Sequence, residues 1–143
     1  HSETLGLLGP EWGEKSIEII DLINHLMRKR PDPRCLIASQ QLGGITKEKN
    51  HSLSSFVHRN AVWKPWVTAA WPSGDLRKRE LSLKWAEEVW DELEHHCPWI
   101  HLAQMHPHLH WHQKELTAAF DKWLPQLKIL KSQFDPNGIM PPL

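Results

Sequence analysis

The feature that most constrains this fold is the order in which helical and extended patterns alternate along the chain. Apolar residues recur at helical spacing within residues 17–30, and three cations before two prolines end that segment. The same period returns in residues 76–96, after a Pro-Ser-Gly-Asp turn, and in residues 113–134, with a bend expected at Pro125. Three helices are therefore predicted.

Three extended segments alternate with these helices. Residues 35–42 form a short, mostly apolar run, residues 56–71 contain Pro65, and residues 99–112 contain Pro107. The order helix, strand, strand, helix, strand, helix predicts an α+β fold, with a small antiparallel sheet and helices on one face. A sheet of so few strands has open edges, so we expect another chain to cover it.

Composition and charge narrow the classes of function. The 143 residues carry 17 cationic and 17 anionic side chains, so the chain has no net positive charge that would favour nucleic acid as a partner. No apolar run of about eighteen residues occurs, and no membrane span is predicted. Nine Trp and no Tyr favour an aromatic pocket or a wide interface in addition to a core.

Other features concern processing and compartment. The chain starts at His1 without an initiator methionine, so we expect it to come from a longer protein by proteolytic processing or excision. Cys35 and Cys97 can form a disulfide or stay reduced, and both options remain open. Asn50 begins an Asn-His-Ser sequon in a polar stretch, which predicts an exposed, glycosylated side chain in a secreted or extracellular protein.

Four histidines alternate with other residues near the third extended segment. If that segment is a strand, all four imidazoles lie on one face, because alternate side chains share a face. The four are His106, His108, His110 and His112. Three interpretations remain open: a solvated strand, a copper or zinc site, or a pH-sensing or catalytic cluster.

Three segments, in the right order, resemble the C-terminal region of FAD-linked oxidases related to berberine bridge enzyme. The first is the Gln-Leu-Gly-Gly end of a strand at residues 41–44, and the second is the Phe-Val-His-Arg-Asn turn at residues 56–60. The third is the helix with its Phe-Asp-Pro-Asn-Gly-Ile turn at residues 123–139.

This resemblance implies the C-terminal part of a two-domain flavoprotein of the PCMH/VAO type. Residues 1–112 would belong to the substrate (cap) domain, and residues 113–143 would form a helix and turn that return to the flavin domain. FAD would be held mainly by an N-terminal chain or subunit, as in a hetero-oligomer. The assembled protein would be an FAD-dependent oxidoreductase that oxidises an alcohol-type carbon of a sugar or aromatic small molecule.

The resemblance also implies site residues. The turn at His58, Arg59 and Asn60 would contact flavin or substrate, although an Arg at such a turn also fits a purely structural role. On the strand that follows, three residues are predicted on the substrate side: Trp63, Trp66 and Thr68. Trp63 has the opposite parity and joins Trp66 and Thr68 only if Pro65 marks a bulge. The alternative is that these Trp residues pack under the helices.

The chain departs from the family pattern where chemistry is expected. Trp66 falls near the position at which the family presents Glu or Gln, and indole cannot accept a proton. The family's Tyr-x-Asn segment is absent, so the predicted base is an imidazole of His108 or His110. Two rival hypotheses remain: a catalytically inactive binding or structural protein with the same fold, and a His-rich metal-binding module.

Overall fold

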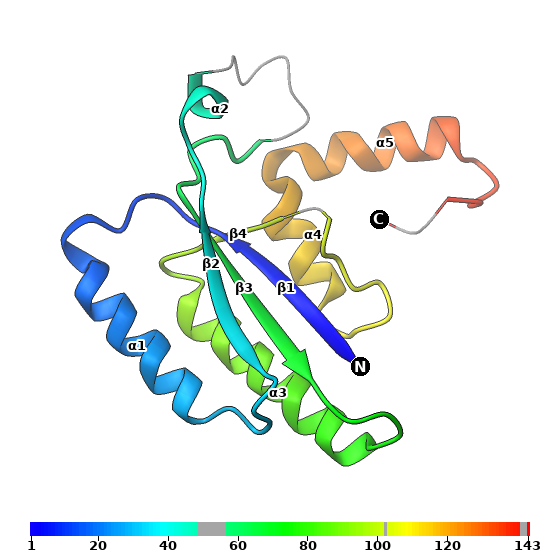
Figure 1. Cartoon of the computed structure of the whole chain (residues 1–143). Helices are drawn as coiled ribbons and strands as arrows, with labels where there is room; N and C mark the ends of the chain where they lie inside the picture. The colour runs from blue at the N-terminus through cyan, green and yellow to red at the C-terminus, as the bar shows by residue number, and fades with distance from the viewer. Residues whose placement is uncertain (49–56, 102, 141–142) are drawn as a thin grey trace.

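The computed structural model describes residues 1–48, 57–101, 103–140 and 143, and has an α+β fold with helices packed on one face of an antiparallel sheet (Figure 1). This arrangement confirms the predicted fold class. The strands are β1 Ser2–Leu8, β2 Leu36–Gln41, β3 Trp63–Ala70 and β4 Trp99–Ile100. The α-helices are α1 Ser16–Arg28, α2 Ile45–Glu48, α3 Leu76–Leu93, α4 His112–Phe120 and α5 Leu124–Phe134, with 3₁₀ turns at Gly13–Lys15 and Asp121–Trp123.

The strands lie in the order β2-β3-β1-β4, and every pair is antiparallel. Strand β1 was not predicted, yet it lies inside the sheet and pairs with both β3 and β4. Its register sets Leu5 opposite Val67 and Gly6 opposite Trp66. The segment Ser2–Leu8 is short and only its second half is apolar, so it gives a weak signal for a strand.

Two predicted elements differ from the structure. The third extended segment is a strand only at Trp99–Ile100, and most of the remainder up to Trp111 forms turns and bends. The last helix is two helices, because Asp121 adopts a positive φ of 48° and breaks the backbone hydrogen-bond pattern. Pro125 lies in the first turn of α5, where a missing N–H costs nothing, rather than at a bend.

The core lies between the sheet and the helix layer. Strands β1 and β3 contribute Leu5, Leu7, Val67 and Ala69, which alternate along each strand and therefore point to the same side. Helix α3 covers them with Trp85, Val89, Trp90 and Leu93, and α1 adds Ile19 and Leu26. The Trp85 indole N–H donates to the Leu26 carbonyl at 3.0 Å, which ties α3 to α1. Four of the nine Trp are buried here: Trp71, Trp85, Trp90 and Trp111.

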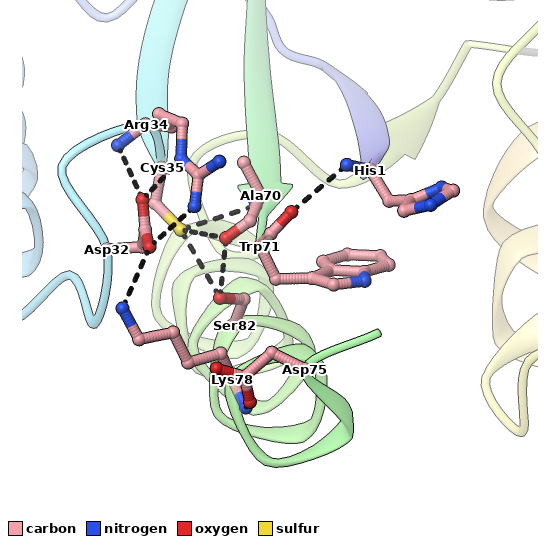
Figure 2. Close-up of polar contacts among 9 residues, drawn as sticks. All are labelled: His1, Asp32, Arg34, Cys35, Ala70, Trp71, Asp75, Lys78 and Ser82. Atoms are coloured by element: carbon pink, nitrogen blue, oxygen red, sulfur yellow. Dashed lines mark hydrogen bonds and ion pairs between the residues drawn. The ribbon is translucent and has the colours of Figure 1, made fainter. Parts of the chain in front are cut away.

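A polar cluster joins the end of β3 to the start of α3 and the turn before β2 (Figure 2). The buried Asp32 carboxylate accepts from the Arg34 guanidinium at 2.8 and 3.0 Å and from Lys78 at 3.5 Å. Nearby, the Ser82 hydroxyl donates to the Ala70 carbonyl at 2.9 Å. This cluster satisfies backbone groups that would otherwise be buried without partners, so we assign it a structural role.

The two cysteines do not pair. Cys35 and Cys97 are both buried and free, and burial raises the pKa of the Cys97 thiol to about 11. Both lie in the core, where the Cys35 sulfur accepts a hydrogen bond from the Ala70 amide at 3.3 Å. Within the described part of the chain, no helix has the length and apolarity needed to cross a bilayer.

The Asp32 cluster generates a stability prediction. The Arg34 guanidinium holds the pKa of the Asp32 carboxyl well below its usual range. Its stabilising effect is therefore present above the unfolded-state pKa of about 4 and is lost as the pH falls through the folded-state pKa. We expect Asp32→Asn to lower the melting temperature at pH 7, with a difference from wild type that shrinks below about pH 4.

Thermal unfolding followed by circular dichroism across this pH range measures the effect. Glu18→Gln, an exposed carboxylate on α1, is the matched control and should leave the melting temperature nearly unchanged. A constant difference between Asp32→Asn and wild type at every pH would contradict the assigned role of the ion pair.

Candidate functional site

The face of the sheet opposite α1 and α3 is not covered by either helix (Figure 1). We call it the open face, and it carries the candidate site. Lys64, Trp66 and Thr68 alternate along β3 and therefore project to this side, opposite Val67 and Ala69. Trp66 lies between the small residues Gly6 and Ala38 on its two neighbouring strands and stays 36 % exposed. The indole is therefore available for contact with a flat ligand.

Thr68 is fixed by its cross-strand neighbour. Its hydroxyl lies 3.1 Å from the Thr4 hydroxyl on β1, directly opposite in the register. Such Thr pairs stabilise a sheet and leave each hydroxyl oxygen able to accept a second hydrogen bond. The pair gives the centre of the open face a polar patch beside the Trp66 indole.

The chain leaving β4 folds over Gly6 on the same face. The His101 amide donates to the Gly6 carbonyl at 2.7 Å, and a Cβ placed on Gly6 would come within 1.9 Å of the Gln104 side-chain oxygen. A larger residue here would have to displace the Gln104 side chain. The His101 Nδ1 and the Gln104 Oε1 are both inaccessible to solvent and have no hydrogen-bond partner among the described residues.

Lys64 supplies the positive charge of the open face. Lys64 is only 7 % exposed, and its ammonium lies 4.8 Å from the centre of the Trp66 ring. Burial lowers the pKa of Lys64 below its ordinary value. Burial, followed by the nearby Lys64 charge, lowers the pKa of His101, so His101 is neutral at pH 7.

These groups together can bind a flat molecule that carries oxygen atoms. Trp66 offers an aromatic face, Lys64 a cation, and His101 a partly exposed imidazole ring. A neutral imidazole can also accept a proton. The donor set is compatible with a flavin ring and a substrate stacked over the sheet, since both are flat and rich in polar edges.

The predicted substrate residues are only partly brought together. Trp66 and Thr68 share the open face, whereas Trp63 has the opposite parity. The β2–β3 register runs without interruption past Pro65, so the bulge that would have turned Trp63 to the same side is absent there. The Trp63 ring stacks on Trp12 at 4.9 Å, which corrects its expected orientation.

The turn predicted to contact a cofactor performs a packing role at one of its residues. His58 is buried, and its Nε2 atom lies 2.8 Å from the Ala119 carbonyl oxygen. The His58 ring stacks on the Trp99 ring, with their centres 5.1 Å apart. Burial lowers the pKa of His58. The contact holds the turn against the end of α4, while cofactor contacts by Arg59 and Asn60 stay a prediction.

The four histidines do not form the predicted ladder, because the segment that carries them is not a strand. Each is paired with a carboxylate instead, and one of these, Glu115, lies only three residues after His112 in the sequence. The buried His106 contacts Glu115 at 2.5 Å and Glu3 at 3.5 Å, and His112 lies 3.4 Å from Glu115. Among the described residues, no group of three or more His, Cys, Asp or Glu side chains is arranged to hold a metal ion, so the proposed copper or zinc site has no geometric support.

The two predicted bases lie near the helix layer. The His108 ring is half-exposed and 2.9 Å from Glu3, and the His110 ring is 72 % exposed and 2.8 Å from Glu87 on α3. Glu3 has the parity of Leu5 and Leu7, which face the core side, so these contacts lie away from Trp66. Asn50, the predicted glycosylation site, is outside the described residues.

Sequence reasoning missed Lys64, His101 and Gln104. Lys64 could have been found, since it precedes Trp66 and Thr68 at two-residue spacing on a predicted strand. His101 and Gln104 could not, because their position depends on the pairing of β4 with the unpredicted β1.

The fold is that of a segment of a berberine-bridge-enzyme-like (BBE-like) protein. Two solved structures, wild-type BBE-like 1 of Physcomitrella patens and a point variant of it, each match with a TM-score of 0.78 and 15 % sequence identity. The match covers 97 % of this chain and 29 % of each of those chains. No family model and no curated protein matches the sequence. The predicted resemblance is thereby confirmed at the level of the fold.

The buried histidine contacts generate a second prediction. Glu115 is fully buried and accepts from the His106 backbone amide at 2.8 Å as well as contacting both rings. Removing one member of a buried hydrogen-bonded group leaves the others without partners. We expect Glu115→Ala to lower the free energy of unfolding by about 3 kcal/mol, measured by urea denaturation. The exposed Glu92→Ala on α3 should change it by less than about 0.5 kcal/mol; equal effects would contradict the assignment.

Proposed function

We propose that this chain is the substrate-side part of an FAD-dependent oxidoreductase that oxidises an alcohol-type carbon of a sugar or aromatic molecule. The observation that carries the proposal is the open sheet face, where Trp66, Lys64 and His101 lie together on a surface that no described helix covers. Bound flavin would supply the hydride-accepting chemistry. This chain would supply the stacking surface, the polar contacts and the proton acceptor.

The resemblance of the sequence to FAD-linked oxidases, together with the fold match to BBE-like 1, supports the flavin part of this proposal. The chain spans less than a third of the length of the BBE-like structures it matches, which is compatible with a separate flavin-binding region. Exposed apolar residues on α5 and its C-terminal extension would pack against that region. They include Ile129, Leu130, Phe134, Ile139 and Met140. The division at residue 112, proteolytic processing, secretion and glycosylation at Asn50 belong to the same proposal.

The proton acceptor in this proposal is a histidine. His101 has the stronger physical case, because its neutral ring lies on the face that carries Trp66, whereas His108 and His110 contact carboxylates near the helix layer. A neutral imidazole on the open face would take the hydroxyl proton of a substrate, breaking the O–H bond and forming an N–H bond.

One observation favours a second candidate, a binding protein that retains the fold without catalysis. Trp66 occupies the centre of the open face, where a proton-accepting side chain would be expected, and the chain contains no Tyr. In that case the open face would bind a flat ligand, and no hydride or proton would be transferred.

The first test is the absorption spectrum of the protein isolated from its source with the subunits that accompany this chain. We expect the visible flavin band, bleached under anaerobic conditions by an alcohol substrate. His101→Gln should slow this bleaching by about 10²–10⁴-fold, the usual contribution of a general base. His108→Gln and His110→Gln, matched imidazole-to-amide changes, should slow it far less.

The possible results separate the hypotheses. A protein without flavin would favour the binding protein. Flavin that is reduced equally fast in the His101→Gln variant and the wild type would place the base elsewhere, and slowing confined to the His108 and His110 variants would restore the original prediction for those residues.

A further inference from the structure

Lys64 differs from four other lysines of the chain, which lie closer to the surface and are paired with carboxylates. Lys29, Lys78, Lys114 and Lys131 each lie within 3.5 Å of a carboxylate oxygen. Lys64 is less exposed than any of them, yet no carboxylate pairs with it among the described residues. A buried charge without a counter-charge is costly, so such a group is characteristic of a site that an anion completes.

The surroundings of Lys64 indicate which anion would fit. Its ammonium lies over the Trp66 ring, whose exposed face can stack on an aromatic ring. His101 and Gln104 lie on the same face, where Gln104 covers Gly6. A flat ring with a carboxylate at one end would satisfy both the cation and the indole, and a hydroxyl at its other end would lie on the side of the His101 ring.

We propose that the open sheet face binds an aromatic carboxylate, with Lys64 pairing with the carboxylate group and Trp66 stacking on the ring. This inference rests on the proposed function for its placement and narrows the substrate from any sugar or aromatic alcohol to an aromatic acid that also carries an alcohol group. Burial lowers the pKa of Lys64, which agrees with an anion site that no carboxylate of the described residues fills.

The test is calorimetric titration of the assembled protein at pH 7 with two matched probes, para-hydroxymethyl benzoate and para-hydroxymethyl benzamide. The two have nearly the same shape and differ in charge. We expect the benzoate to bind at least about tenfold more tightly, because a charge-assisted hydrogen bond to a poorly solvated ammonium is stronger than a neutral one.

Substitutions assign the preference to Lys64. Lys64→Met should abolish the preference for the benzoate, and Lys64→Arg should keep it, since the charge remains. Lys84→Met, which removes an exposed lysine from α3 in the helix layer, is the control and should also keep it. Equal binding of the two probes to the wild type, no binding of either, or an unchanged preference in Lys64→Met would overturn the proposal.

A second readout uses the wild type and does not depend on whether a variant folds. Lys64 lowers the pKa of His101, so a bound carboxylate that neutralises Lys64 should raise it. An NMR titration of the His101 ring should show this rise with the benzoate and not with the benzamide; no rise would count against the site.

The flavin content of the same sample is read from its absorption spectrum. If the sample prefers benzoate but contains no flavin, the anion site is supported and the oxidoreductase proposal is contradicted. If it contains flavin but does not prefer benzoate, the oxidoreductase proposal is supported and the anion site is contradicted.

Discussion

The pairing of β1 with both β3 and β4 is the interaction on which the rest of this structure depends. It places Leu5 and Leu7 under the helices and Gly6 on the opposite face, because side chains alternate along a strand. Without β1, the chain from β4 onward would have no sheet edge to join. The same pairing brings His101 and Gln104, which follow β4, next to Trp66 on β3.

The two faces of the sheet differ in their side chains. The covered face is apolar and closely packed, with Trp85 and Trp90 of α3 lying over Val67 and Ala69. The opposite face carries a nearly buried cation, Lys64, and an exposed indole, Trp66. A buried cation without a counter-charge among the described residues is costly for folding, and for this reason we propose that a ligand completes this face.

The sequence predicted the fold class, two of the three long helical segments and the strand that bears Trp66 and Thr68, because these follow from local periodicity and turn residues. It did not predict β1, whose apolar residues are too few to define a period, and it overextended the last strand as far as His112. The carboxylate partners of the histidines were also missed. Glu3 is more than one hundred residues from His106, and such contacts are set by tertiary packing rather than by local sequence.

The central claim of this account is that the open sheet face, and not the helix layer, meets the flavin and the substrate. The most direct test is an experimental structure of the assembled protein with its flavin-binding region and a bound aromatic ligand. The account predicts the ligand in contact with the Trp66 ring, between the sheet and the flavin. A structure in which other protein side chains cover Trp66, with the flavin against α1 or α3, would contradict it.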